Sequence, residues 1–328
     1  AIILDVGSAL TLDGIISANG GNGTANDCGG GSGGSILVHT KTLAGAGRFS
    51  VNGGNGTPYA GAGSGGRVAV YYETGSFSGF TNSASAGGAL SRNGQAGTLG
   101  FFNTALGAGK YHLLVPSYRF DYGTGSVVTL ESLTAGIAGA PLTASVELAA
   151  SSLITAGDIT VAAAGTLFVG GGSTMTVARS LSLTGSNATM ICGGRHAGEM
   201  VNSNWLGAGV VISASNVTIS AGSRMHGDAQ GYRSTAHGTA GCGLGGGARG
   251  FGSGGGGGGY GGVGGNGADG LGGVTYGSQY HPIDLGSGGG CGDEGTPTGH
   301  GGSAIILSVA DTLLLDGLIS VNGGNGTA

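Results

Sequence analysis

The sequence predicts an all-β protein whose fold is a right-handed parallel β-helix, or solenoid, with long glycine-rich loops. Three observations lead to this prediction: the opening stretch returns near the end, apolar residues alternate with period two, and glycine is concentrated between the alternating segments. Short strands cannot bury an apolar face alone. Stacked coils can, because each strand then lies beside its equivalent in the next coil and a continuous apolar column is buried.

The repeat comprises residues 1–25, AIILDVGSALTLDGIISANGGNGTA, and residues 304–328, AIILSVADTLLLDGLISVNGGNGTA. Eighteen of these 25 positions are identical, at a constant offset of 303 residues. A shorter copy, ILVHTKTLAGAGRFSVNGGNG, covers residues 36–56. Such repetition is typical of tandem arrays, so residues 304–328 are predicted to begin a second unit.

Alternation is seen within the first 25 residues, because seven apolar side chains fall on even-numbered positions. This period is typical of half-buried strands. Breaks at Gly7-Ser8 and Asp13-Gly14 predict three short strands separated by tight turns. The even-numbered residues are Ile2, Leu4, Val6, Leu10, Leu12, Ile16 and Ala18.

The composition favours an ordered β framework. Glycine and proline account for 82 and 5 of 328 residues, yet 39% of the residues are hydrophobic, only 8% are charged, and the net charge is −5. A disordered chain would combine low hydrophobicity with high net charge. A nucleic-acid-binding chain would carry a basic patch. Strong helix formers are scarce, and no apolar run approaches the roughly 20 residues of a transmembrane helix.

Glycine content divides the sequence into four stretches. Residues 1–100 are predicted to form glycine-rich coils, and residues 101–225, which have less glycine, compact coils with short turns. Residues 226–303 form a glycine-rich insertion, with 31 glycines among residues 241–303, and residues 304–328 start the next unit. The insertion is expected to pack on the solenoid, either folded back over it or as a bundle of extended polyglycine helices.

The block Asn-Gly-Gly-Asn-Gly begins at Asn19, Asn52 and Asn322. If these asparagines occupy equivalent places in stacked coils, their amides can bond to one another along the stack, because an amide carries both a donor and an acceptor. Alternatively, they occupy turn positions with positive φ. Both roles are structural.

Sequons and cysteines point to a secreted chain. Five Asn-x-Thr tripeptides are candidate N-linked glycan sites. The cysteines form no CxxC pair, which argues against zinc ribbons and thioredoxin-type motifs and favours disulfides in an oxidising compartment. We expect Cys291 to pair with the Cys28 equivalent of a following unit, or with Cys242. The candidates are Asn22, Asn55, Asn187, Asn216 and Asn325 for glycans, and Cys28, Cys192, Cys242 and Cys291 for disulfides.

No metal, cofactor or catalytic site is predicted. The one cluster of plausible metal donors, whose spacing matches no zinc motif, is His226, Asp228, His237 and Cys242. Residues 264–271, GGNGADGL, fit a single copy of the calcium-binding β-roll nonapeptide, which needs consecutive copies. The carboxylates are scattered, and none is grouped with Lys or Arg as in β-helix enzymes that cleave acidic polysaccharides. We therefore expect no enzymatic activity.

Residues 1–72 and 289–328 contain the repeated sequence pattern GGSILV…GRFSVNGGNG…GAGSGGRVAVYY. This pattern resembles the glycine-rich β-solenoid repeat modules of large extracellular proteins of algae and protists. Proteins of the tubular flagellar hairs, or mastigonemes, are among them. The resemblance covers about a third of the chain. It implies an extracellular, glycosylated building block without chemistry of its own.

We therefore expect a structural subunit of an extracellular glycoprotein filament or surface appendage, such as a flagellar hair, built by tandem or end-to-end stacking. Roughly ten coils per unit would advance it by about 50 Å. The expected partners are copies of the chain and covalent glycans, with no nucleic acid, no membrane span and no cofactor. An adhesin or a carbohydrate- or ice-binding module is the alternative and predicts outward threonine ranks or aromatic platforms. A polysaccharide-processing enzyme is the third option.

Overall fold

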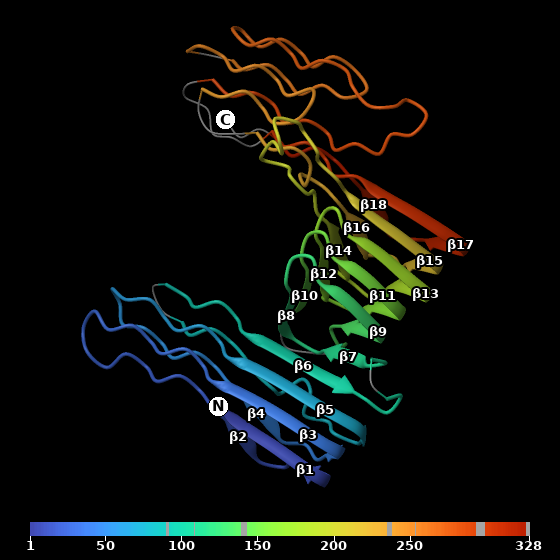
Figure 1. Cartoon of the computed structure of the whole chain (residues 1–328). Coiled ribbons are helices and arrows are strands. Elements are labelled where there is room, and N and C mark those ends of the chain that lie inside the picture. Colours follow the sequence, from blue (N-terminus) through green and yellow to red (C-terminus); the bar gives the residue numbers. More distant parts are fainter. Residues whose placement is uncertain are drawn as a thin grey trace.

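The computed structural model describes residues 1–89, 92–107, 109–138, 143–234, 238–252, 254–292 and 299–325. Within these residues all regular secondary structure is β-strand, and no helix occurs. Most strands belong to one large, mostly parallel sheet that winds into a solenoid (Figure 1). The predicted all-β, parallel solenoid class is confirmed. A search of the same residues for a helix long and apolar enough to cross a membrane finds none.

The strands follow one another along the whole chain, apart from a long gap between residues 226 and 305. They are β1 (Ile2–Thr11), β2 (Ile15–Ser17), β3 (Ser35–Ala44), β4 (Arg48–Ser50), β5 (Arg67–Gly75), β6 (Thr98–Asn103), β7 (His112–Val115), β8 (Tyr118–Tyr122), β9 (Val127–Ala135), β10 (Ala144–Leu148), β11 (Leu153–Val161), β12 (Thr166–Val169), β13 (Thr174–Leu183), β14 (Thr189–Cys192), β15 (Val210–Ile219), β16 (Arg224–His226), β17 (Ile305–Leu315) and β18 (Leu318–Ser320).

Two columns of parallel strands build the C-terminal stack. Strands β7, β9, β11, β13, β15 and β17 form one column, and β8, β10, β12, β14, β16 and β18 the other. Each inward side chain lies over its register partner in the next coil, so the apolar residues form continuous ladders that bury the core. One such ladder is Val146, Leu167, Met190, Met225 and Ile319, of which the first four are fully buried.

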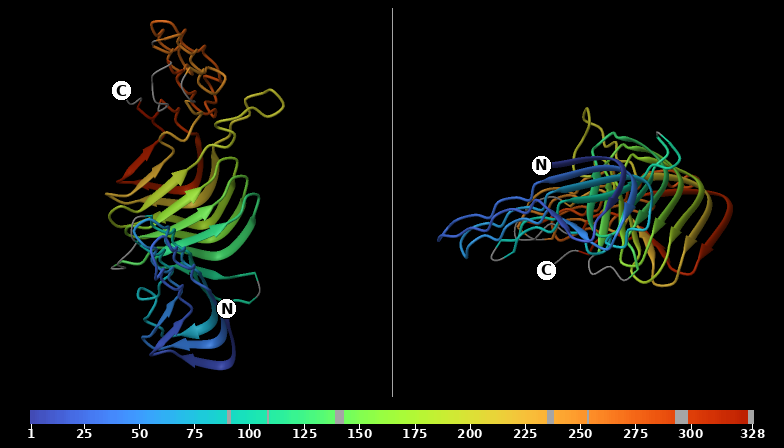
Figure 2. Two further views of the ribbon diagram at one scale, coloured as in Figure 1. Left: turned by 90° about the vertical axis from the view of Figure 1, so that its left-hand side faces the viewer. Right: turned by 90° about the horizontal axis from the view of Figure 1, so that it is seen from below.

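The N-terminal stack contains β1, β3, β5 and β6, with the short strands β2 and β4 paired beside them. Its connection to the C-terminal stack is irregular, because β6 pairs antiparallel with β7 and meets β8 only at Thr98 and Arg119. Figures 1 and 2 show that the solenoid steps sideways at this point. Aromatic rings fill the step, and Tyr71 stacks on Phe102 with ring centroids 4.5 Å apart. Strand alternation could not predict such a step.

The predicted turn at Gly7-Ser8 is wrong. Residues 2–11 form one continuous strand, and the register with β3 shifts between Val6 and Ala9. Gly7 and Ser8 stand opposite the single residue Lys41, so a bulge accommodates one extra residue while the strand pairs with β3 on both sides of it. The other predicted break, Asp13-Gly14, does separate β1 from β2.

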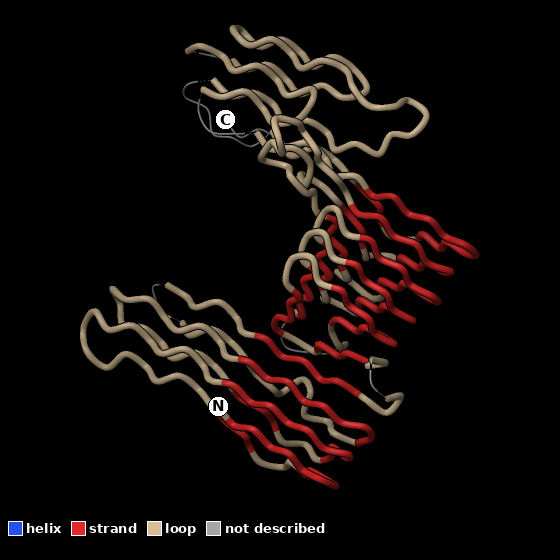
Figure 3. The backbone as a smooth tube through the Cα atoms, in the orientation of Figure 1, coloured by secondary structure: helices blue, strands red, loops and turns tan. Residues whose placement is uncertain are grey.

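Glycine-rich segments leave both stacks as extended chains without regular strand structure (Figure 3). We call residues 19–34, 52–66, 84–89 and 92–97 the N-terminal bundle, and the described residues between 227 and 303 the C-terminal bundle. In the N-terminal bundle, Gly31 N donates to Gly21 O at 2.8 Å and Gly54 N donates to Gly31 O at 2.8 Å.

The C-terminal bundle has the same construction. Gly257, Gly265 and Gly273 belong to three neighbouring segments, and Gly257 N donates to Gly265 O while Gly273 N donates to Gly257 O, both at 2.9 Å. A Cβ on Gly273 would lie 1.8 Å from Gly245 O. Only glycine permits backbones to lie this close.

Candidate stacking interface at the two ends

The first and last coils each have a strand neighbour on one side only, within the part of the chain that the structure describes. Strand β1 pairs with β3, and β17 pairs with β15. The open side increases exposure: Leu313 in β17 is 46% exposed, whereas Val217, its register partner in the internal strand β15, is 1% exposed. Each terminal coil therefore presents an open, partly apolar edge.

Asn19 and Asn52 occupy equivalent places in consecutive coils, where the strands give way to the N-terminal bundle. Asn19 Oδ1 accepts hydrogen bonds from Asn52 N at 2.7 Å and from Ser50 Oγ at 2.8 Å. Asn52 Oδ1 accepts one from Ala86 N at 2.9 Å. Neither asparagine has a positive φ. The amide oxygens thus link successive coils through the backbone and not through one another's amides.

The last coil repeats this arrangement with one change, because Asp228 takes the place of Asn19. Asp228 Oδ1 accepts from Asn322 N at 2.6 Å, and Oδ2 accepts from Ser320 Oγ at 2.8 Å. A carboxylate accepts both hydrogen bonds as an amide oxygen does. The spacing Ser-Val-Asn, shared by Ser50–Asn52 and Ser320–Asn322, is the signal that could have located this contact.

The candidate glycan sites lie at different depths. Asn22, Asn55, Asn187 and Asn325 are exposed, and Asn187 sits in a turn with φ of 63°. Asn216 is half-buried in β15. Asn22 Oδ1 accepts from Asn55 N at 2.8 Å. This contact leaves the amide nitrogen, where a glycan would be attached, without a hydrogen bond to the described residues.

No disulfide joins any two of the four cysteines, all of which belong to the described residues. The expected pair of Cys242 and Cys291 is therefore not formed: both are buried in the C-terminal bundle, and Cys291 Sγ lies 3.3 Å from Ser234 Oγ. Cys192 is buried at the end of β14, and Cys28 is exposed. Pairing of Cys291 with a Cys28 of a following copy stays a prediction.

The metal-donor candidates do not assemble around one point. Asp228 is engaged with the last coil, and His226 Nδ1 lies 3.7 Å from Asp228 Oδ2. His237 lies outside the described residues. Among the residues described, no three His, Cys, Asp or Glu side chains are placed to hold a metal ion. Residues 264–271 lie in the C-terminal bundle, where Asn266 Oδ1 accepts from Gly272 N at 2.9 Å.

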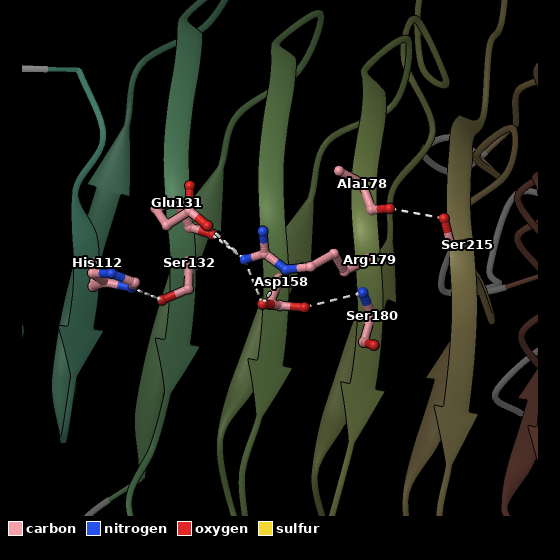
Figure 4. A network of polar contacts seen from close by, with 8 residues as sticks. All are labelled: His112, Glu131, Ser132, Asp158, Ala178, Arg179, Ser180 and Ser215. Atoms are coloured by element: carbon pink, nitrogen blue, oxygen red, sulfur yellow. Dashed lines mark hydrogen bonds and ion pairs between the residues drawn. The ribbon is translucent and has the colours of Figure 1, made fainter. Parts of the chain in front are cut away.

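A polar network on the outer face joins three coils of the C-terminal stack (Figure 4). Arg179 Nη2 lies 2.6 Å from both Asp158 Oδ2 and Glu131 Oε1. The expectation that no Asp is grouped with Arg is therefore wrong, because β9, β11 and β13 stack with these residues at the same bend. The hydrogen bonds to Asp158 and then to Glu131 raise the pKa of Arg179. One guanidinium neutralises part of both carboxylates, so the cluster links coils.

A groove of about 700 Å³ lies beside β1, β3 and β5. Asp5 Oδ1 lies 2.9 Å from His39 Nδ1 at its edge. The ring of Tyr71 is packed against His39 on one side and stacked on Phe102 on the other, with centroid distances of 5.1 and 4.5 Å. A sugar needs a free ring face on which to stack, and Tyr71 offers none.

The chain was also compared with protein family models, with curated proteins and with solved structures. None of the three comparisons gives a match. Function is therefore inferred from the stacking geometry described above.

Proposed function

We propose that this chain is a structural segment of an extracellular filament or surface appendage, built by stacking units of 303 residues. One observation carries the proposal: residues 304–325 repeat the coil of residues 1–22, and each coil is covered on the side that the other leaves open. An open strand edge exposes unpaired N–H and C=O groups and must be capped or continued. Repetition of the same coil favours continuation.

Several finer features belong to this proposal. The coils wind right-handed, the glycine-rich segments form loops along the filament, and the exposed sequons carry glycans. The partners are copies of the same chain, and the location is outside the cell or on its surface, for example in a flagellar hair. The role is mechanical and requires no cofactor or catalytic step. The resemblance to algal and protist repeat modules supports these features.

The dimensions of the filament follow from the sheet. Nine strand-to-strand steps lead from β1 to β17. At ~4.8 Å a step, one unit extends roughly 43 Å along the sheet. Because the stack is displaced at β6, the outline would show one lateral step per unit. Electron microscopy of native material should show filaments with an axial repeat of roughly 40 to 50 Å. Compact particles with capped ends would overturn the proposal.

A second candidate is a binding module, which a regular outward rank of hydroxyl groups favours. Five side chains lie in register on successive strands: Thr129, Thr155, Thr176, Ser213 and Ser308. All are exposed except Ser213, which is half-buried. Hydroxyl groups repeated at the strand spacing of ~4.8 Å suit a periodic surface such as a crystalline polysaccharide or ice. Adsorption to either surface that is lost in Thr155→Lys would support this candidate; no adsorption would exclude it.

A polysaccharide-processing enzyme is the third candidate. The grouping of Asp158 and Glu131 with Arg179 is its only support among the described residues. A sugar-release assay on acidic polysaccharides tests it, with Asp158→Asn as the control variant. Absence of released sugar from the unaltered chain would remove this candidate.

A further inference from the structure

The first and last coils have nearly the same sequence but different neighbours. The first coil is covered by the coil that follows it, and the last coil is covered by the coil that precedes it. Six of their seven inward residues are the same, and the seventh is Ala18 in the first coil and Val321 in the last. The other six positions at which the coils differ are exposed in the first coil. The inward pairs are Ile2 and Ile305, Leu4 and Leu307, Val6 and Val309, Leu10 and Leu313, Leu12 and Leu315, and Ile16 and Ile319. A coil that packs against one of these two coils can therefore pack against the other.

We infer that residues 304–328 take the place of residues 1–25 of a following copy in a tandem array. The open side of residues 304–325 then binds residues 35–57 of that copy, with the contacts that residues 1–22 make to residues 35–57 in the structure. The inference rests on the proposed stacking function and specifies its partner. Strand β17 takes the β3 of the following copy, as β1 takes β3. Strand β18 takes the following β4, as β2 takes β4.

The apolar contacts of this junction are those already seen between the first two coils. Leu4 lies in register with Val38, and Leu10 with Leu43. Leu307 and Leu313, their equivalents in the repeat, would face the same valine and leucine of the following copy. Leu313 is 46% exposed. Covering it would remove apolar surface from water, which favours association.

The polar contacts of the junction follow from one hydrogen-bond acceptor that has no donor among the described residues. Asn19 Oδ1 accepts two hydrogen bonds from the next coil. Asn322 occupies the equivalent place, but its Oδ1 accepts none from the described residues, while its backbone N–H is bonded to Asp228. The following copy supplies the missing donors, the backbone N–H of its Asn52 and the hydroxyl of its Ser50. Likewise, Ser17 and Asn19 donate to the Asp228 of a preceding copy.

Gly54 allows the backbones of two successive copies to lie close together at the junction. A Cβ on Gly54 would lie 2.0 Å from Gly21 O. Gly324 is the equivalent of Gly21, and Gly324 N donates to His300 O at 2.8 Å, as Gly54 N donates to Gly31 O. The Gly54 of a following copy can approach Gly324 equally closely. The C-terminal bundle of one copy and the N-terminal bundle of the next then become one bundle.

Hydrogen exchange tests the junction directly. A two-unit chain is made in which residues 26–328 of a second copy follow residue 328, and exchange of the segment 305–320 is measured by mass spectrometry in this chain and in the single unit. The two-unit chain contains this segment twice, once at the junction and once at its open end. We expect half of the peptide to exchange as in the single unit and half at least ~10-fold more slowly, because the copy at the junction has become an internal strand. Equal exchange in the two chains would overturn the inference.

A matched pair of variants assigns the contact to the asparagine. In the single unit, Asn19→Ala should lower the melting temperature, whereas Asn322→Ala should leave it unchanged, because the Asn322 side chain accepts no hydrogen bond there. In the two-unit chain, Asn322→Ala should speed exchange of residues 318–325. Unchanged exchange in that variant would contradict the assigned contact.

The test separates the junction from the filament role. Protection in the two-unit chain without filaments in native material would retain the junction and refute the proposed function. Filaments without this protection would refute the junction, since the units would then be joined elsewhere.

Discussion

The backbone N–H of Asn322 donates a hydrogen bond of 2.6 Å to Oδ1 of Asp228, which lies 94 residues earlier. The same bond joins Asn52 to Asn19 at a separation of only 33 residues. Between Asp228 and Asn322 the chain makes the whole C-terminal bundle and then returns to the position of the next coil. The long insertion therefore leaves the stacking of the coils unchanged.

Replacing Asp228 should weaken attachment of the last coil. Asp228→Ala removes the acceptor for both Asn322 N and Ser320 Oγ. We expect the free energy of unfolding to fall by about 2 to 4 kcal/mol, because hydrogen bonds to a charged group each contribute ~1.5 to 3 kcal/mol. Urea unfolding measures the loss. Asp228→Asn keeps an acceptor and should cost less than about 1 kcal/mol; an equal loss in both variants would show that the charge, and not the acceptor, matters.

Close glycine packing in the N-terminal bundle should tolerate no side chain at Gly63. A Cβ there would lie 2.0 Å from Gly31 O, whereas a Cβ on Gly61 would meet nothing within 4 Å. Gly63→Ala should lower stability by about 1 to 3 kcal/mol through overpacking. Gly61→Ala should be neutral or slightly stabilising, since it restricts the unfolded chain. Thermal unfolding of the two variants compares them, and equal melting temperatures would contradict the bundle.

Alternation in the sequence was sufficient to predict the coils. Ile36 and Val38 are buried while Leu37 between them is not, because residues two apart share a face of a strand. The turn expected at Gly7-Ser8 failed for a related reason. The strand pairs with β3 on either side of those two residues and so holds them in a bulge. The turn preference of Gly-Ser is local and contains no information about pairing with a neighbouring strand.

Contacts between distant coils were beyond sequence reasoning. Glu131, Asp158 and Arg179 are separated by 21 to 48 residues, and they meet only because three strands stack with their bends aligned. The role of Asp228 was missed because the sequence places it beside two histidines, where it resembles a metal donor. The Ser-Val-Asn sequence of residues 320–322 marks the donors of this contact, but only the placement of the insertion shows that Asp228 is their acceptor.

Cysteine reactivity should follow burial. Burial raises the pKa of Cys192 to about 12, so little thiolate forms near pH 8, and the thiolate is the reactive species. Cys28 is exposed. Iodoacetamide at pH 8 should modify Cys28 more than ~100-fold faster than Cys192, as measured by peptide mass spectrometry. In denaturant the two should react alike; equal rates in the folded chain would show that β14 does not enclose Cys192.

Acid should destabilise the region where the C-terminal bundle meets the last coil. Burial lowers the pKa of His226 from 6.5, Arg224 lowers it further, and Asp228 opposes this. Burial and then Arg233 lower the pKa of His300 from 6.5, and its Nδ1 accepts a hydrogen bond from Ser234 N at 2.9 Å. Both rings therefore bind a proton less readily in the folded chain than in the unfolded chain. Below pH 6.5 the unfolded chain binds protons that the folded chain does not, so stability falls as the pH falls.

Urea midpoints at pH 7.5 and at pH 5.5 measure this effect. We expect a lower midpoint at pH 5.5 for the unaltered chain and a smaller difference for the variant carrying both His226→Gln and His300→Gln, which cannot take up these protons. Protonation of His300 Nδ1 also removes the acceptor for Ser234 N, so the protection of the Ser234 amide from hydrogen exchange, relative to its intrinsic rate at each pH, should decrease in acid. The variant His39→Gln is the control, because His39 is exposed and pairs with Asp5 far from the C-terminal bundle. An equal pH dependence in the double variant and the unaltered chain would place the acid-sensitive groups elsewhere.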